Sequence, residues 1–293
     1  MKLQFTKMHA LGNDFVVIDD RDSKLKRLSQ LSKTLCDRRL GVGADQLLVL
    51  GTSKKADFRM RIFNADSSEV EMCGNGIRCL GKYIWDYIFR CEESVFSRKY
   101  CQSIDSVSVE TLAGIMKIHK TRNLFRVDMG GPVLKPELIP VDLSKLPKKF
   151  HNTRIIKHSL KAGNKTFKVN CISMGNPHAV IVVKNTDSVD LGTSGRMIEN
   201  HSLFPNRTNV EFIQVLNKTN IKMRVWERGA GETLACGTGA SASVVASVLL
   251  GLTERKVTVH LPGGKLLIYW SEKDNHVYMT GPAVTVFFGR IDI

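Results

Sequence analysis

The 293-residue chain repeats itself at a fixed spacing. The run EMCGNGIRC at residues 71–79 returns as LACGTGASA at residues 234–242, which aligns Cys73 with Cys236 at an offset of 163. That offset holds without a gap over about 65 positions, so that LGNDFVVI aligns with MGNPHAVI and MRIFN aligns with MRVWE. A repeat of this length predicts that one arrangement of strands and helices is built twice.

The repeat continues beyond the cysteines at a second spacing. The offset there is 150, as though the first copy carried 13 extra residues near FRCEESVFSRKYC, and VDMGGPVL aligns with VYMTGPAV. Two constant offsets separated by one insertion predict two homologous halves, residues 1–137 and 164–293, with a basic linker at 138–163. In this scheme the C-terminal strand is free to cross back to the first half.

Both halves have the sequence pattern of strands with one helix after the cysteine. Runs rich in branched or alternating apolar residues, FVVID, QLLVL, FRMRIFN and SVSVET, predict strands. IRCLGKYIWDYIF and ASASVVASVLL predict helices, and Gly251 ends the second. We therefore expect an α/β (α+β) fold with mostly antiparallel strands in each half.

The composition is that of a folded, water-soluble protein, with 43% hydrophobic and 24% charged residues. No apolar run approaches the roughly 18 residues of a membrane span, and MKLQFTKMHALGNDF lacks the apolar block of a signal peptide. The seven cysteines include no Cys-x-x-Cys pair and no metal-ligand spacing. We expect a cytoplasmic protein with reduced thiols, five of them small buried side chains, and no metal.

The formal net charge of +15 raises the alternative of nucleic-acid binding. Between Leu143 and Thr186 there are nine Lys or Arg residues and no Asp or Glu, but Phe150 and Phe167 are the only aromatic residues there. Nucleic-acid surfaces usually interleave aromatic residues or present a recognisable module. A solvated basic linker is favoured, and no nucleic-acid partner is expected.

The repeated Cys-Gly-x-Gly turn has a chemical meaning. Glycines let the backbone bring N–H groups close to an anion, and a helix that begins there adds the positive end of its dipole. The same surroundings stabilise a thiolate and lower the pKa of a cysteine, which makes Cys73 and Cys236 candidate reactive thiols. The alternative is that both are inert residues packed beneath tight turns; that alternative is weakened because the repeat retains a polar pair, Asn13 and Asn176.

Two thiols that approach one carbon from opposite sides suit inversion of a stereocentre. One thiolate removes a proton from one face while the neutral thiol returns a proton to the other. Donors at the two helix starts would stabilise the charge that develops when an amino acid loses its α-proton. The sequence contains no Walker loop or dinucleotide fingerprint, and the scheme needs no cofactor.

The sequence resembles the diaminopimelate epimerases over essentially its whole length. The resemblance rests on MHALGNDF, RRLGVGADQLL, FNADSSEVEMCGNGIRC, MGNPHAV, RTNVEF and WERGAGETLACGTGA, which occur in that order. It implies a pyridoxal-independent isomerase of lysine and peptidoglycan biosynthesis that interconverts LL- and meso-diaminopimelate. It also implies a homodimer of two-domain subunits, with strands wrapped around a central helix in each domain and the active site in a cleft between them.

The resemblance also implies roles for individual residues. Cys73 and Cys236 would be the base and acid, and His178 and Glu227 would tune them. The expected substrate-binding residues are Asn13, Gln46, Asn64, Gly74, Asn75, Asn176, Asn209, Glu227, Arg228, Gly237 and Thr238. Arg228 has a physical rationale, because a planar guanidinium can hold a distal carboxylate through two hydrogen bonds.

Three positions depart from the family pattern. Ser67 and Ala10 stand where relatives usually have Gly, so both turns must avoid glycine-like dihedral angles or accept a cost of order 1 kcal/mol. Phe287 stands where many relatives have a Tyr that takes part in the dimer, which puts that hydrogen bond in doubt.

Two other functions stay open from the sequence. Another cofactor-independent racemase with two cysteines, acting on proline or hydroxyproline, is the nearer one, although Asn64, Asn209 and Arg228 favour a longer substrate with a charged far end. A redox protein in which the two cysteines form a regulatory disulfide is the other.

Overall fold

A computed structural model of the chain describes residues 2–89 and 104–292. Of the expected insertion FRCEESVFSRKYC, only the first residue, Phe89, is among the described residues. The chain divides into two compact units, which we call the first unit (Met1–Asp128 with Thr280–Ile293) and the second unit (Met129–Met279). The expected division into halves at 1–137 and 164–293 follows the sequence repeat rather than these contacts and stays a prediction.

The first unit consists of strands and two main helices. Its elements are β1 (Lys2–Ala10), β2 (Asn13–Asp19), α1 (Leu28–Cys36), β3 (Gln46–Gly51), β4 (Phe58–Asn64), β5 (Glu69–Val70), α2 (Gly74–Tyr83), the π-helical turn η1 (Ile84–Ile88), β6 (Ser106–Thr111), β7 (Gly114–Thr121), β8 (Leu124–Asp128) and β18 (Val284–Asp292).

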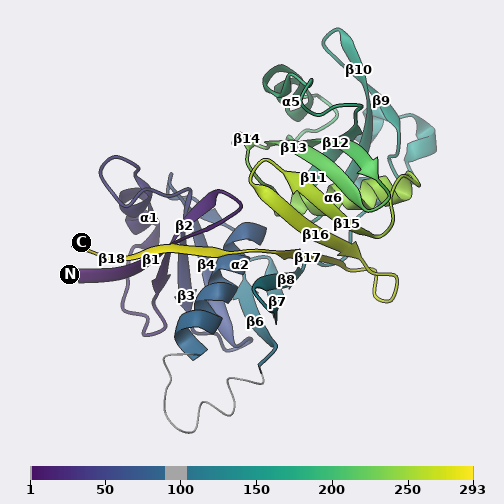
Figure 1. Cartoon of the computed structure of the whole chain (residues 1–293). Coiled ribbons are helices and arrows are strands. Elements are labelled where there is room, and N and C mark those ends of the chain that lie inside the picture. The colour runs from purple at the N-terminus through teal and green to yellow at the C-terminus, as the bar shows by residue number, and fades with distance from the viewer. Residues whose placement is uncertain (1, 90–103, 293) are drawn as a thin grey trace. The chain divides into compact units, whose positions relative to one another are not determined.

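Strands of the first unit pair in the order β18, β1, β2, β3, β4, β6, β7, β8. The β2–β3 and β4–β6 pairs are parallel, and the other pairs in this order are antiparallel. Figure 1 shows β1 and β18, which carry the two chain ends, lying side by side. The last strand of the chain therefore completes the unit that the first strand begins.

The second unit has the same kinds of elements. They are the short 3-10 helices η2 (Pro136–Leu138), η3 (Leu143–Lys145) and η4 (Lys148–Phe150), then β9 (His158–Ala162), β10 (Lys165–Ser173), β11 (Pro177–Val182), α5 (Leu191–Glu199), β12 (Asn209–Asn217), β13 (Asn220–Glu227), β14 (Gly231–Thr233), α6 (Gly237–Leu249), β15 (Lys256–Leu261), β16 (Gly264–Trp270) and β17 (Val277–Gly281), whose last two residues belong to the first unit.

Strand register repeats between the units at the offsets found in the sequence. Phe15 of β2 pairs with Gln46 of β3 in parallel, and 163 residues later His178 of β11 pairs with Asn209 of β12 in the same way.

The second offset appears in the same form. Val107 of β6 pairs with Ile118 of β7, and 150 residues later Val257 of β15 pairs with Ile268 of β16. The sequence repeat is therefore a repeat of backbone structure, and the expected fold class is confirmed.

Two helices were not expected from the sequence. α1 connects β2 to β3 and α5 connects β11 to β12, and in both cases the strands joined are parallel. Parallel neighbours need a crossover connection, usually a helix, because the chain must return to the same end of the sheet. The two crossover helices begin and end at positions 163 residues apart.

α2 and α6 are the central helices of their units. α2 contacts strands β1, β2, β3, β4, β7, β8 and β18, whereas α6 contacts β10, β11, β12, β13, β15 and β16. α6 is built of Ala, Ser, Gly and Val and is buried over most of its length, as expected for a helix with strands on several sides. Its buried serines stay hydrogen-bonded, because Ser241 donates to the Gly237 carbonyl oxygen and Ser247 to that of Val244.

The segment 138–163, expected to be a basic linker, packs into the second unit. Ile139, Leu146, Phe150 and Ile155 are buried in a core cluster with residues of β10, β11, β12 and α5. Its lysines lie on the outside, since Lys148, Lys149 and Lys161 are exposed. The segment is therefore a covering layer of the second unit as well as a connection.

Candidate active site

The two cysteines occupy identical positions at the starts of the central helices. Cys73 precedes α2 with φ −135° and ψ 115°, and Cys236 precedes α6 with φ −127° and ψ 115°. In each turn the backbone N–H three residues later, at Gly76 or Gly239, donates to the cysteine sulfur over 3.4 Å. Each sulfur thus takes the N-cap role that a Ser or Asp oxygen usually fills.

Asn13 connects β2 to the first turn. Its Oδ1 accepts from Asn75 Nδ2 at 3.2 Å and lies 3.7 Å from Cys73 Sγ, while its own Nδ2 donates to Asp45 at 2.8 Å. The structure therefore brings Asn13, Cys73 and Asn75 together as expected from the sequence. Cys73 is half-buried.

The second turn has a longer chain of polar contacts. Thr238 Oγ1 lies 3.5 Å from Cys236 Sγ and accepts from Asn176 Nδ2 at 3.3 Å. Asn176 Oδ1 lies 2.9 Å from His178 Nε2, and His178 Nδ1 lies 2.7 Å from Glu211 Oε1. The chain runs from the Cys236 sulfur to a carboxylate buried under the helix start.

Glu227 adds a second carboxyl group beside Cys236. It accepts a hydrogen bond from Thr233 Oγ1, and burial raises its pKa above the ordinary value although hydrogen bonds from Thr233 and Cys236 oppose the shift. His178 and Glu227 therefore both lie in the surroundings of Cys236 rather than of Cys73.

Cys236 does not have the low thiol pKa expected from its place at a helix start. Burial raises its pKa well above the ordinary value, and the negative charges of Glu227 and Glu211 raise it further, against the smaller effects of Thr238 and the Gly239 N–H. The expectation is wrong for this cysteine because desolvation and two carboxylates outweigh the helix dipole.

The other predicted binding residues gather at the same end of the strands. Asn13 and Gln46 begin β2 and β3, and Asn64 ends the antiparallel β4. Gln46 Nε2 donates to Asn64 Oδ1 at 2.8 Å, and Asn64 Nδ2 donates to Ser68 at 2.9 Å.

The second unit repeats this placement with Asn176, Asn209 and Glu227. Asn209 donates through Nδ2 to the Pro177 carbonyl oxygen at 2.9 Å and accepts from the Arg228 N–H at 3.0 Å. The Arg228 guanidinium is exposed and donates to the Asn206 carbonyl oxygen at 3.3 Å. Gly74 and Gly237 are the first residues of α2 and α6 and are buried.

Three further cysteines have the surroundings of inert thiols. Burial raises the pKa of Cys36 and of Cys171 to about 12 and raises that of Cys79 as well. Cys91 and Cys101 lie outside the described residues. Cys73 differs from these three in being half-buried, and the sulfurs of Cys73 and Cys236 both lie near polar side chains. That these two are the reactive thiols stays a prediction.

Residues 2–89 and 104–292 contain neither a metal-binding cluster nor a membrane-spanning helix. No group of three or more His, Cys, Asp or Glu in this range could hold a metal ion. No helix in the same range is long and apolar enough to span a bilayer.

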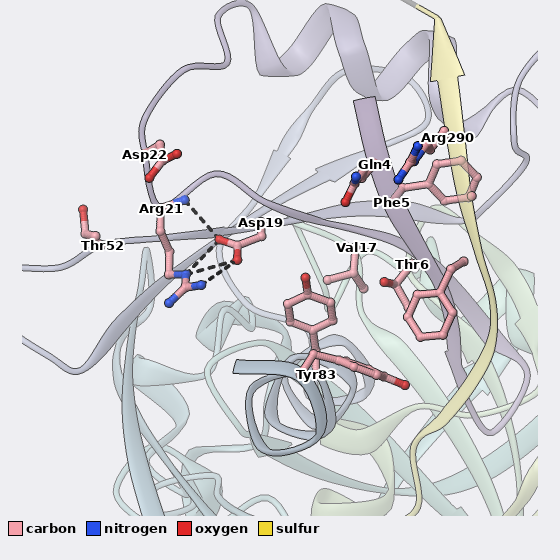
Figure 2. A pocket seen from close by; sticks show the side chains of 13 residues that line it. Gln4, Phe5, Thr6, Val17, Asp19, Arg21, Asp22, Thr52, Tyr83 and Arg290 are labelled. Carbon is pink, nitrogen blue, oxygen red and sulfur yellow. Dashed lines mark hydrogen bonds and ion pairs between the residues drawn. The ribbon is translucent and has the colours of Figure 1, made fainter. Parts of the chain in front are cut away.

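A groove in the first unit is lined by none of the predicted site residues. It has a volume of about 1100 Å³ and is lined by β1, β18 and the end of α2 with η1. Figure 2 shows Tyr83 at its floor, the Arg21–Asp19 ion pair on one side and Arg290 on the other. None of its lining residues belongs to the cysteine turns.

The chain is similar in sequence to a known family and to individual proteins over most of its length. The model of the family described as diaminopimelate epimerase matches residues 5–135 and 170–286. The diaminopimelate epimerase of Acetivibrio thermocellus is 49% identical and that of Methanococcus maripaludis is 47% identical, and each alignment covers 99% or more of both chains. The chain belongs to the diaminopimelate epimerase family.

Solved structures of low identity share the fold of this diaminopimelate epimerase family member. A hydroxyproline epimerase from Agrobacterium vitis matches with a TM-score of 0.65 at 12% identity, over 99% of this chain and 91% of that one. A phenazine biosynthesis protein of the PhzF family from Bacillus anthracis matches with a TM-score of 0.64 at 18% identity, over the full length of both chains.

Two of the residues that depart from the diaminopimelate epimerase pattern, Ser67 and Ala10, differ in backbone conformation. Ser67 has φ of 77°, so this turn keeps the left-handed conformation without glycine. Ala10 instead ends β1, and the positive φ values fall on the next two residues, Leu11 and Gly12.

Two buried charged residues of this family member were missed in the sequence. Glu211 contacts His178, and Arg78 donates to Asn75 Oδ1 at 2.8 Å beside the first cysteine. Both side chains are fully buried. The available signal was a charged residue in an otherwise apolar run, Glu211 in NVEFI and Arg78 in GIRCL.

Proposed function

We propose that this chain is a diaminopimelate epimerase that interconverts LL- and meso-diaminopimelate with Cys73 and Cys236 as base and acid. The observation that supports this most is the repeated turn: each cysteine precedes a central helix with nearly the same dihedral angles and accepts from the N–H of the residue three positions later. Such a pair suits a reaction in which one proton is removed and another is returned.

The chemistry follows from the residues at the two turns. A thiolate takes the α-proton of the substrate while the other thiol gives a proton to the opposite face of the same carbon, and the roles exchange in the reverse direction. The dipoles at the starts of α2 and α6 favour the α-carboxylate and the charge that spreads onto it. This scheme uses no cofactor.

The remaining residues have roles in binding and tuning. Arg228 is proposed to hold the distal carboxylate, with Asn64 and Asn209 as neighbouring amides, since a guanidinium binds a carboxylate through two parallel hydrogen bonds. His178 and Glu227 are proposed to tune Cys236, a role that fits their contacts in the second unit.

The test is incubation with LL-diaminopimelate in deuterated water. We expect meso product that carries deuterium at the inverted α-carbon, with the rate lowered by about 10² to 10⁴ in Cys73→Ala and in Cys236→Ala. Cys171→Ala is the matched control, because Cys171 is a buried thiol outside the two turns. Absence of both deuterium and meso product with the unmodified protein would rule the proposal out.

Proline and hydroxyproline racemisation is the alternative to be measured in parallel. The hydroxyproline epimerase shares the fold at 12% identity, whereas the diaminopimelate epimerases compared above are 47% and 49% identical. Deuterium exchange into proline without exchange into diaminopimelate would favour the alternative.

A homodimer in the cytoplasm is the proposed setting. β18 exposes Val286, Phe287 and Phe288, with 54%, 46% and 60% of their surfaces accessible, and Phe288 also lines the groove of Figure 2. Large apolar side chains exposed on one strand are typical of an interface, and a second copy is the proposed occupant. Reduced catalytic thiols fit a reducing compartment. Sedimentation of the protein and of Phe288→Ser tests the dimer.

A further inference from the structure

The two cysteine turns have the same backbone but different buried side chains beneath them. In the first turn a Cβ added to Gly76 would lie 3.1 Å from Leu48 Cδ2, and in the second a Cβ added to Gly239 would lie 2.7 Å from Glu211 Oε1. Residues 48 and 211 are equivalent at the offset of 163. The place filled by a leucine under Cys73 is therefore filled by a carboxylate under Cys236.

Arg78 and Ser241 are a second pair that is equivalent at the offset of 163, and here the charged side chain is in the first turn. Arg78 Nη1 donates to the carbonyl oxygen of Gly74 at 3.0 Å, and Ser241 Oγ donates to that of Gly237 at 2.9 Å. Both side chains are fully buried and reach the residue that follows the cysteine. The first turn thus has a guanidinium where the second has a neutral hydroxyl.

The charge on Arg78 persists at neutral pH. Burial lowers its pKa to about 10, and attraction to Cys79 and Cys73 opposes that shift. A guanidinium with this pKa is a cation under physiological conditions, in a place where water screens it little. The thiolate form of Cys73 gains from that cation.

The two carboxyl groups near Cys236 act in the other direction. Glu211 from β12 and Glu227 from β13 lie on the side of Cys236, and the Oε2 atom of Glu211 is buried with no hydrogen-bond partner in the part of the chain that the structure describes. His178 from β11 contacts Glu211, and Thr238 and Gly239 contact the sulfur from α6. A thiolate here would face carboxylates at close range in a buried place.

We propose that Arg78 and Glu211 set the two thiols to opposite protonation states in the resting protein, with Cys73 as the thiolate and Cys236 as the thiol. The inference deepens the proposed function, because a two-thiol inversion needs one proton donor and one acceptor before substrate arrives. Neither residue would contact the reacting carbon. Each acts through the electrostatic potential at a cysteine sulfur, which favours or disfavours the thiolate.

Thiolate absorbance in the far ultraviolet tests the assignment without substrate. We expect Cys73→Ala to lose about one thiolate per chain at pH 7, and Cys236→Ala to lose none. Subtracting the absorbance of each variant from that of the unmodified protein cancels the contribution of the other cysteines, including those outside the described residues. Equal losses in the two variants, a loss confined to Cys236→Ala, or no loss in either would overturn the proposal.

The two charged residues are tested by further substitutions in these backgrounds. In Cys73→Ala, adding Glu211→Gln keeps the side-chain shape and should let Cys236 ionise at a pH lower by about one unit or more. In Cys236→Ala, adding Arg78→Ser, the residue of the second turn, should move ionisation of Cys73 to higher pH.

Two controls make the outcomes distinct. Circular dichroism identifies an Arg78→Ser protein that has not folded, and the Glu211→Gln result then decides alone: an unchanged titration of Cys236 overturns the proposal. If the titrations come out as expected but diaminopimelate is not epimerised, the proposed function fails while the assignment of the thiols stands.

Discussion

At the scale of single residues, Asp14 fixes the loop that precedes β3 against the start of β2. Its carboxylate lies 2.7 Å from Lys7 Nζ and 2.7 Å from Arg38 Nη2, next to Asn13 of the proposed site. Burial opposes ionisation, but the hydrogen bonds from Arg38 and Lys7 outweigh it and hold the pKa of Asp14 well below its usual range.

This low pKa predicts how Asp14→Asn responds to pH. A carboxyl group whose pKa is lower in the folded state contributes stability above its unfolded pKa of about 3.9, and loses it as the pH falls towards the folded value. Because Arg38 is 59% exposed, we expect a loss of only about 1–2 kcal/mol at pH 7. Urea unfolding at several pH values measures it: the difference from the natural protein should shrink below about pH 4. A difference that is constant down to pH 2 would contradict the explanation.

A site residue could be predicted from the sequence when the equivalent position in the other half of the chain has the same residue type. Cys73 and Cys236 were identified because each has its counterpart in the other half. Glu211 could not be found in this way, since its counterpart is Leu48, and a lone Glu in a strand is usually on the solvent side. Its full burial and its contact with His178, both seen only in the three-dimensional structure, show that it faces inward.

At the scale of elements, α5 packs closely on β13 through a glycine. A Cβ at Gly195 would lie 2.6 Å from Trp226 Cβ, and the Trp226 indole is held by a hydrogen bond to Glu199 at 2.7 Å. The indole therefore cannot move away without losing that bond.

Gly195→Ala should consequently lower the free energy of unfolding by about 1–3 kcal/mol, although alanine favours helix. Gly192→Ala in the same helix is the matched control, because its Cβ would have only Asp190 Oδ1 at 3.8 Å as a neighbour. Urea unfolding of the two variants gives the comparison. Equal stability of the two proteins would show that the packing of α5 is looser than described.

Strands were easier to predict than the crossover helices. FRMRIFN and SVSVET match β4 and β6 at both ends, because their alternation and turn residues are local signals. α1 and α5 follow from the parallel pairing of the strands that they connect, and that pairing joins residues far apart in the sequence. Period-two patterns do not show whether neighbours run parallel.

At the scale of the whole molecule, the first unit depends on the last strand. β18 pairs with β1 along its length, and Gly289 lets the Phe5 ring approach: a Cβ at that position would lie 2.3 Å from Phe5 Cζ. Removal of residues 284–293 would leave β1 as an unpaired edge and uncover the Phe5 ring.

We therefore expect the truncated protein to lose stability in one unit only. Hydrogen exchange should become fast in β1, β2 and α2, while α6 and β10–β13 keep their protection. Hydrogen–deuterium exchange read by mass spectrometry separates the two sets of peptides. Slow exchange in β1 of the truncated protein would contradict the dependence on β18, and fast exchange in both sets would contradict the independence of the second unit.

The return of the chain from the second unit to β1 also imposes an order on synthesis at the ribosome. The second unit is one continuous stretch, Met129–Met279, whereas the first needs residues from both ends of the chain. At about 5–20 residues per second, the wait from Asp128 to the end of the chain lasts on the order of ten seconds or more. The unit made first is thus the one finished last, and until then its edge strand β1 is available to chaperones or to other nascent chains.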